Sequence, residues 1–253
     1  MSEFNEETTP GLRLLELLEM LAGDGRALAL PEVVRLCGWP KPTVHRMLVQ
    51  LEGAGWLQRE PDGRRYLGSR RLLQLGETVL GASTRQGVRH AVLRQLVADL
   101  GESCNLTVRS GAEVVYLDRV ESAFPLRMEL RAGTRVPLHC SASGKIFLAS
   151  MAAGQRKALL DELPLARYTA TTLTDRQALE DELKTIRREG YSVDDGEFVE
   201  GLVCVAVAVP AAAGGAVRCA LALQAPSARL GLTQAREFLP RLREAAQALG
   251  RTL

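Results

Sequence analysis

Apolar residues in the first 55 positions recur at helical spacing in three short segments. The pattern predicts one helix at residues 10–21 and two more that begin near Pro31 and Pro42. Gly38 follows the second of these helices and is expected to be its left-handed C-cap. The apolar stripe of the third helix consists of Val44, Met47, Leu48 and Leu51, so its outer face carries Thr43, His45, Arg46 and Gln50.

A short β-hairpin is predicted directly after the third helix. Residues 56–59 and 65–67 have strand character, and Pro61-Asp62-Gly63 between them is typical of a tight turn. Residues 28–30 are expected to pair with this hairpin as a further short strand. Two helices joined by a turn and followed by a hairpin are the architecture of a winged helix-turn-helix, a DNA-binding module.

The local charge of this region favours DNA binding. Between Arg26 and Arg71 there are nine basic and four acidic residues, and contacts with phosphate groups need such an excess of positive charge. Arg64 and Arg65 lie on the predicted wing, near the helix that carries Arg46. Helix-turn-helix pairs also occur in proteins that never touch nucleic acid, so a winged protein-interaction module is the alternative interpretation.

The remaining chain alternates between helical and strand-like periodicity. Residues 69–80 are predicted to form a linker helix whose broad apolar face packs either in a dimer or within its own chain. Further helices are predicted at 86–100, 141–151, 153–163, 174–189 and 233–249, and strands at 104–109, 114–119, 126–130, 191–193, 202–209 and 217–224. This pattern indicates an α+β fold with an antiparallel, GAF-like sheet domain.

Composition restricts the class of protein further. A chain of 253 residues is long enough for about two domains, and its 46% hydrophobic and 25% charged residues are ordinary for a globular protein. Five scattered cysteines without a CxxC motif and three distant histidines predict neither a disulfide framework nor a metal site, and no cofactor is expected. The acidic, polar N-terminus excludes a signal peptide, and the most apolar run, residues 203–217, is too short for a membrane span. We therefore expect a cytoplasmic protein.

An enzyme is the second alternative, because His139, Cys140 and Asp195 are the residue types of a thiol nucleophile and its partners. Adjacent residues on an extended segment point to opposite faces, so His139 would not readily activate Cys140. No catalytic residue is therefore expected.

Two further motifs have simple structural interpretations. Ser143-Gly144-Lys145 suggests a phosphate-binding loop, but positions 139 and 146 lack the glycine and hydroxyl residue that such a loop needs. Lys145 is therefore expected at the surface or in a helix cap. The run Asp194-Asp195-Gly196-Glu197 is expected to be a turn of solvated carboxylates, with Asp195 pointing inward, rather than a metal-binding loop.

The chain resembles the IclR family of bacterial transcriptional regulators over nearly its whole length, and four stretches carry this resemblance. They are PKPTVHRMLVQLEGAGWL (residues 40–57), RVPLHCSASGKIFLA (135–149), REGYSVDDGEFVEGLVCVAVAVP (188–210) and ALALQAPSARL (220–230). The resemblance implies a winged helix-turn-helix domain at 1–68, a linker helix at 69–83 and a GAF-like effector-binding and oligomerisation domain at 84–253. It also implies a homodimer or homotetramer that binds a palindromic operator in double-stranded DNA and responds to a small-molecule effector, often an organic acid.

The resemblance also places DNA contacts on individual residues. Base and phosphate contacts fall on Lys41, Thr43, His45 and Arg46, and wing contacts fall on Arg64 and Arg65. Gln50 on the same outer face joins this set. The chain departs from the family at Pro42, where relatives often have serine or threonine. Proline lacks the N–H and the hydroxyl that could hold a phosphate.

An effector pocket is implied between the helix start at Cys140–Lys145 and the strands around Asp195 and Cys204. The small residues Ala142, Ser143 and Gly144 offer backbone N–H groups at the positive end of a helix dipole, which suits a carboxylate. Cys204 is either a buried inert thiol or a ligand contact, and the apolar side is expected from Met128, Leu130 and Leu138.

The last family stretch carries a second departure. Relatives that hold a keto acid often have serines where this chain has Ala222 and Gln224. The missing hydroxyls argue against pyruvate or glyoxylate and favour a larger or less polar ligand.

Overall fold

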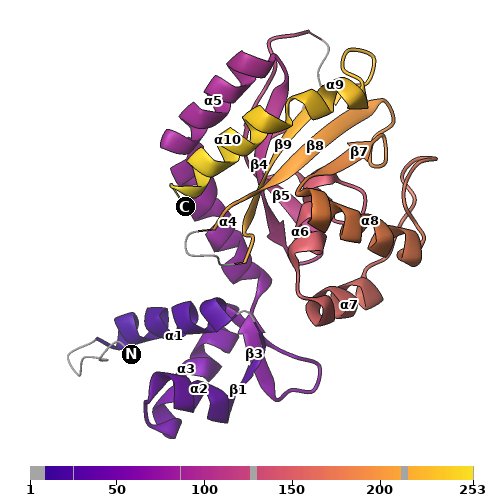
Figure 1. Cartoon of the computed structure of the whole chain (residues 1–253). Helices are drawn as coiled ribbons and strands as arrows, with labels where there is room; N and C mark the ends of the chain where they lie inside the picture. The colour runs from indigo at the N-terminus through magenta and orange to yellow at the C-terminus, as the bar shows by residue number, and fades with distance from the viewer. Residues whose placement is uncertain (1–8, 25, 86, 126–129, 212–215, 253) are drawn as a thin grey trace. The chain divides into compact units, whose positions relative to one another are not determined.

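The computed structural model describes residues 9–24, 26–85, 87–125, 130–211 and 216–252 (Figure 1). The chain divides into two units, Met1–Thr78 and Val79–Leu253, and the division falls within a helix. Each unit has its own hydrophobic core. Within the described ranges, no helix combines the length and the apolar character that crossing a bilayer requires.

The first unit is a winged helix-turn-helix. Its elements are α1 (Pro10–Asp24), β1 (Leu28–Ala29), α2 (Leu30–Cys37), α3 (Lys41–Gly53), β2 (Leu57–Arg59) and β3 (Arg65–Gly68). The three strands form an antiparallel sheet in the order β1-β3-β2. The predicted helices, the hairpin and the short strand beside it are therefore confirmed, although Leu30 belongs to α2 rather than to β1.

The turn between α2 and α3 is set by local chemistry. Gly38 has a φ of 70°, and its N–H donates to the carbonyl oxygen of Val34, as a left-handed C-cap requires. Pro42 lies in the first turn of α3, where a missing N–H breaks no helical hydrogen bond. Val44 and Leu48 are fully buried against the first unit's core, and α3 is thereby held with one face inward.

The helix that joins the two units, α4 (Arg70–Arg85), follows β3 directly. Ser69 forms its cap, because the Ser69 hydroxyl accepts hydrogen bonds from the N–H groups of Arg71 and Leu72. The helix runs five residues beyond the predicted end at residue 80. Leu73, Leu75 and Val79 expose about half of their surface, so the expected role of this helix in dimerisation stays a prediction.

The second unit is built around a six-stranded antiparallel sheet. Its helices are α5 (Val88–Leu100), α6 (Ala142–Ser150), α7 (Ala153–Glu162), α8 (Arg176–Glu189), α9 (Leu232–Glu237) and α10 (Leu239–Gly250). Its strands are β4 (Ser103–Ser110), β5 (Glu113–Val120), β6 (Arg135–Pro137), β7 (Ser192–Asp195), β8 (Leu202–Val209) and β9 (Cys219–Pro226). The strand order is β6-β5-β4-β9-β8-β7, and every pairing is antiparallel.

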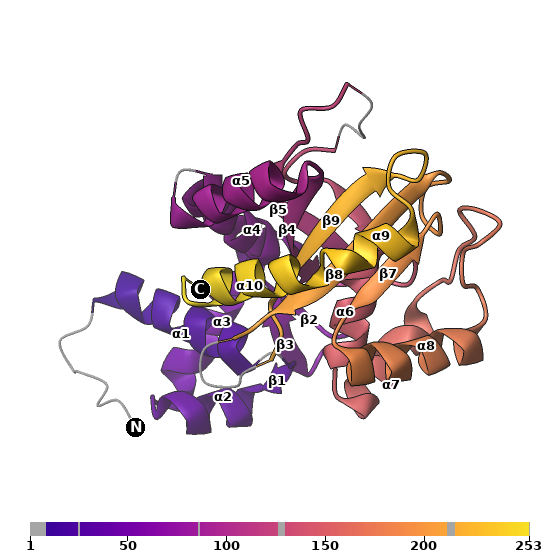
Figure 2. The ribbon, with the colours of Figure 1, turned by 45° about the horizontal axis from the view of Figure 1, so that its top comes forward.

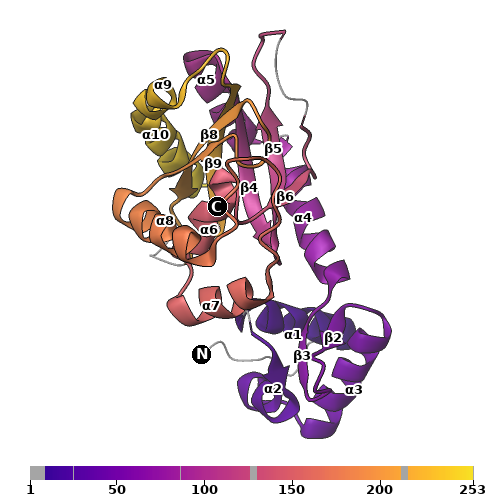
Figure 3. The same ribbon diagram turned by 90° about the vertical axis from the view of Figure 1, so that its right-hand side faces the viewer.

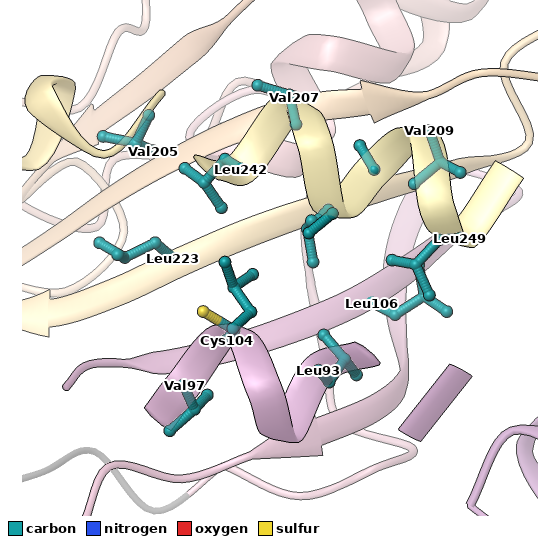
Figure 4. Packing of buried hydrophobic residues seen from close by; sticks show 14 of the residues in the cluster. Leu93, Val97, Cys104, Leu106, Val205, Val207, Val209, Leu223, Leu242 and Leu249 are labelled. Carbon is teal, nitrogen blue, oxygen red and sulfur yellow. The ribbon is translucent and has the colours of Figure 1, made fainter. Parts of the chain in front are cut away.

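Helices cover both faces of this sheet. On one face α5 and α10 pack against β4, β8 and β9, and Figure 2 shows α10 in yellow lying along β8. Figure 4 shows the side chains of this core, with Leu93 from α5 and Leu249 from α10 pointing toward Leu106 of β4. On the other face α6 packs against the sheet and α8 packs against α6 (Figure 3). Side chains on both faces of the central strands are consequently buried.

Two predicted elements differ from the structure. The predicted strand at 126–130 falls mostly on residues 126–129, which lie outside the described residues, and the strand that pairs with β5 is β6. The single helix predicted at 233–249 is two helices, α9 and α10, which meet at Phe238. Pro240 in the first turn of α10 explains the break, because proline cannot continue a preceding helix.

Candidate nucleic-acid interface and ligand cavity

The outer face of α3 presents polar side chains to solvent. Lys41, His45, Arg46 and Gln50 are exposed together with Pro42, while Thr43 is half-buried. Among the described residues, the side chains of Lys41, His45 and Arg46 make no hydrogen bond or ion pair. The predicted outward orientation of this face is therefore present, and its donors are available to an external partner.

The three arginines of the wing are all exposed, but the side chain of Arg59 already contacts neighbouring groups of the chain. Arg59 donates to Glu52 at 2.9 Å and to the carbonyl oxygen of Gly63 at 2.9 Å, and its guanidinium lies 4.6 Å from the centre of the Tyr66 ring. These contacts attach the wing to α3. Arg64 and Arg65 are exposed near the wing tip, where positive side chains can reach a phosphate backbone.

The second unit contains a small cavity between the start of α6 and the sheet. The cavity volume, measured as the space that the centre of a water molecule can occupy, is about 20 Å³. Typical small-molecule pockets are far larger, at roughly 300–1,000 Å³. Any organic acid, and still more the larger ligand expected above, therefore needs a wall of this cavity to move. The lining residues are Asn105, Tyr116, Val136, Ser141, Ala142, Ser143, Asp194, Phe198, Cys204, Ala222 and Gln224.

Strand register brings the polar lining residues together. Asp194 of β7 lies opposite Cys204 of β8, which lies opposite Gln224 of β9. One step along the sheet, Asn105 of β4 lies opposite Ala222 of β9. Side chains in register on neighbouring strands point to the same face, so residues distant in sequence line one floor beneath α6.

The start of α6 forms the opposite wall. Ser141 is the N-cap: its hydroxyl accepts from the N–H of Gly144 and donates to the carbonyl oxygen of Pro137. A side chain at Gly144 would meet the carbonyl oxygen of Leu138 at 2.2 Å, so only glycine allows this close approach. The first N–H groups of a helix have no intrahelical acceptor, and those of Ala142 and Ser143 belong to this wall.

The predicted effector residues separate into those that line the cavity and those that do not. Ala142, Ser143, Cys204, Ala222 and Gln224 line it. Leu138 and Gly144 are buried beside it, and Leu130 is half-buried in the same apolar cluster. Met128 lies outside the described residues.

The expectation that Asp195 points inward is wrong. Asp195 is exposed, and Asp194, one position earlier, is 2% exposed and lines the cavity. One Asp194 oxygen accepts from the N–H groups of Glu197 and Phe198 at 2.7 and 3.4 Å. Burial raises the pKa of Asp194 to about 6. Successive strand residues point to opposite faces, so Asp194 points into the cavity and Asp195 points to solvent.

The expectation for Lys145 is also wrong. Its side chain is fully buried and binds Glu182 at 2.5 Å and Glu197. Burial opposes the charged form of Lys145, but the two carboxylates raise its pKa. Burial raises the pKa of Glu197 to about 7 despite the nearby ammonium group. Asp194 and Glu197 are thus not solvated, and within the described ranges no cluster of side chains could hold a metal ion.

The environment of Cys140 does not support nucleophilic catalysis. Its thiol is fully buried, and burial raises its pKa to about 12, so almost no thiolate is present near neutral pH. The Nε2 atom of His139 lies 2.9 Å from the carbonyl oxygen of Ala166. Burial lowers the pKa of His139.

Sequence reasoning missed several cavity residues. The omitted ones are Asn105, Tyr116, Val136, Ser141, Asp194 and Phe198. Asn105 gave no signal, because it occupies a polar position in the alternating run 104–109, which predicts a solvent-facing side chain, yet it is 1% exposed. Phe198 gave no signal either, since it follows Glu197 in a turn, and the partner of Glu197, Lys145, is 52 residues away in sequence.

Comparisons with known proteins agree along the whole chain. The family model of the bacterial transcriptional regulator IclR C-terminal domain matches residues 84–251, and that of the IclR helix-turn-helix domain matches residues 12–61. The probable transcriptional regulator SauR of Cupriavidus necator is 43% identical over 249 residues, which cover 98% of each chain.

Solved structures show the same architecture. The crystal structure of the Thermotoga maritima IclR has a TM-score of 0.64 at 27% identity and covers 96% of this chain and 97% of its own. The inducer-binding domain of a PobR double mutant from Acinetobacter, in complex with 3-hydroxybenzoic acid, has a TM-score of 0.60 at 25% identity. That match covers 64% of this chain and 95% of the other.

Proposed function

Because this chain belongs to the IclR family of bacterial transcriptional regulators, we propose that it binds a palindromic operator as a dimer or tetramer and that a small organic acid controls this binding. The chain has the family's helix-turn-helix DNA-binding domain, and its relatives are regulators rather than enzymes. Regulators of this family bind DNA and small-molecule effectors and oligomerise.

The exposed polar face of α3 is the observation that supports operator recognition. Exposed Lys41, His45, Arg46 and Gln50, with half-buried Thr43 beside them, would contact base edges and phosphates in a major groove. Arg64 and Arg65 on the wing would contact the backbone of the adjacent groove. Pro42 contributes no N–H, so phosphate contacts near the start of α3 depend on Lys41.

Electrophoretic retardation of the DNA upstream of the gene tests this proposal. We expect a complex that survives an excess of unrelated DNA and weakens steeply as salt rises, because bound phosphates release counterions. Footprinting should then show two symmetry-related half-sites, as a symmetric dimer requires. Retardation that unrelated DNA abolishes would instead favour the protein-interaction module.

The cavity beneath α6 supports effector binding in the second unit. A carboxylate at the N-terminus of α6 would accept hydrogen bonds from the N–H groups of Ala142 and Ser143 and interact with the positive end of the helix dipole. Ala222, Cys204 and Gln224 would form the floor, with Leu130 and Leu138 on the apolar side. The complex of the PobR inducer-binding domain with a hydroxybenzoic acid is consistent with an acid in this kind of domain.

Thermal unfolding of the full chain in the presence of short-chain acids tests the effector site. A ligand that binds only the folded state raises the midpoint in a concentration-dependent way. Acids should shift the midpoint, whereas the corresponding amides, which carry no negative charge, should not. Equal shifts from acids and amides would contradict a carboxylate at α6.

A further inference from the structure

A buried arginine fixes the orientation of one amide in the cavity floor. Arg119 of β5 has a side chain that is 3% exposed, and its Nη1 donates to Oε1 of Gln224 at 2.7 Å. Arginine can only donate, so the carbonyl end of the Gln224 amide must face Arg119. The NH₂ end of Gln224 is thereby directed away from Arg119, toward the other lining residues.

The surroundings of Gln224 agree with this orientation. Tyr116 and Cys204 line the cavity together with Gln224, and Cys204 lies directly opposite Gln224 in the strand register. The side of the amide that faces away from Arg119 therefore borders the cavity. Gln224 therefore presents a donor to the cavity.

An unpaired acceptor lies on the adjacent strand. Asn105 is 1% exposed and lines the cavity, and among the described residues its Oδ1 has no hydrogen-bond partner. Asn105 of β4 lies opposite Ala222, two residues before Gln224 on β9. Buried side-chain oxygens almost always have a partner, so an unpaired one that lines a cavity indicates a ligand with a donor group.

We propose that the effector is a hydroxy acid, whose hydroxyl accepts from Gln224 and donates to Asn105 while its carboxylate lies at the start of α6. This inference rests on the effector site proposed above and specifies its ligand class. A hydroxyl is a small group that both donates and accepts hydrogen bonds. It can therefore pair with Gln224 and with either the oxygen or the NH₂ group of Asn105, whichever way that amide is turned. Arg119 is then a positioning residue, because it acts on the ligand through Gln224.

Other acids satisfy this floor less well. An unsubstituted acid gives Oδ1 of Asn105 no donor and offers the NH₂ group of Gln224 no hydroxyl acceptor. A keto oxygen accepts from Gln224 but gives nothing to Oδ1 of Asn105. A second carboxylate would also lack a donor for Asn105 and would lie near the carboxyl group of Asp194, which lines the same cavity.

A set of three-carbon acids tests the inference with the full chain. The probes are propionate, lactate, 3-hydroxypropionate and pyruvate, with affinities from isothermal titration calorimetry. We expect one of the two hydroxy acids to bind about tenfold more tightly than propionate and more tightly than pyruvate, because its hydroxyl gives the unpaired Oδ1 of Asn105 a donor and accepts from Gln224. The two hydroxy acids place the hydroxyl at different distances from the carboxylate.

Variants then assign the preference to these residues. In Gln224→Leu, Asn105→Leu and Arg119→Met, the ratio of hydroxy-acid to propionate affinity should fall to about twofold or less. Arg218→Met is the matched control, because Arg218 is exposed and does not line the cavity. It should keep the tenfold ratio. Arg119→Lys, which retains a donor, should recover part of the ratio that Arg119→Met loses.

The outcomes separate this inference from the proposed effector site. Equal affinities for propionate and both hydroxy acids, or tightest binding of pyruvate, would overturn the hydroxy-acid assignment and leave an acid-binding site intact. Binding of none of the four acids would overturn both. Because the four wild-type measurements decide the ligand class, the inference stays testable even if a variant does not fold.

Discussion

The two units carry their candidate functional residues in opposite ways. In the first unit, Arg46 and its neighbours lie on the exposed face of α3, and Val44 and Leu48 on the other face form the core. In the second unit, Asn105 and Gln224 are buried between the sheet and α6. Residues on the exposed face of α3 can therefore be substituted without loss of stability. Substitutions in the cavity, in contrast, also disturb the packing of α6 against the sheet.

The unfolding of the two units can be followed separately, because tryptophan fluorescence reports on one of them. The chain has two tryptophans, Trp39 and Trp56, and both pack against the core of the first unit. Tryptophan emission thus follows the winged unit alone, while circular dichroism follows helices of both. A change confined to the second unit should move the second signal and not the first.

Lys145→Met should have the largest effect on stability. The substitution leaves Glu197 buried without its cation, and breaking a buried ion pair costs about 3–5 kcal/mol. We expect the circular dichroism transition in urea to move to lower denaturant, with the tryptophan transition unchanged. Since the pKa of Glu197 is raised to about 7, the loss should be smaller at pH 5, where this carboxyl is protonated.

A second substitution checks the cause of that loss. Glu197→Gln added to Lys145→Met removes the uncompensated charge and should recover part of the stability. No recovery, or an equal shift of the tryptophan transition, would contradict a local electrostatic origin in the second unit.

Gly144→Ala should destabilise the same unit somewhat less. The added methyl group would meet the backbone of Leu138 at 2.2 Å, and separating α6 from that backbone should cost about 3 kcal/mol. Gly154→Ala is the matched control in α7, because nothing lies within 4 Å of the new atom. It should be neutral or slightly stabilising in urea denaturation. Similar losses for both variants would show that the close approach of α6 to Leu138 does not decide the result.

The exposed site could be predicted from sequence because its elements are half-buried. A helix with one apolar stripe has only one arrangement on a core, so Val44 and Leu48 also determine where His45 and Arg46 point. Gly38 and the hairpin turn could also be predicted, because the local sequence determines the backbone conformation at both places.

The buried site could be predicted only in outline. Both faces of the sheet are covered, so β8 is apolar in almost every position and shows no alternation from which to assign a face. On β7 the usual rule is inverted: Asp194 is buried while the neighbouring Val193 is only half-buried. Lys145 was misplaced because its partners, Glu182 and Glu197, are 37 and 52 residues away in sequence.

Arg46→Ala should weaken operator binding without affecting either unfolding transition. Arg46 is exposed, and one good bidentate base contact contributes about 1–3 kcal/mol, roughly a five- to 150-fold change in affinity. Arg35→Ala, an exposed arginine on α2 rather than α3, is the matched control. Retardation assays at physiological salt measure both. Unchanged specific affinity in Arg46→Ala would exclude this docking of α3.

The smallest predicted effect is a pH dependence of acid binding that originates in Asp194. Above about pH 7 its carboxylate is charged and opposes an anionic ligand, and near its pKa of about 6 it takes up a proton. A bound carboxylate raises that pKa further, so binding is coupled to proton uptake. The affinity for lactate should therefore increase several-fold as the pH falls from about 8 to about 6.

Two neighbouring substitutions sharpen this prediction. Asp194→Asn retains the oxygen that accepts from the N–H groups of Glu197 and Phe198 but cannot titrate, so the affinity for lactate should vary much less with pH. Asp195→Asn makes the same change one position along, on an exposed side chain, and should keep the wild-type profile. If Asp195→Asn flattened the profile and Asp194→Asn did not, the exposed carboxylate would be the one that senses the ligand. The contrast between an exposed and a buried site would then fail at the residue where sequence and structure disagree.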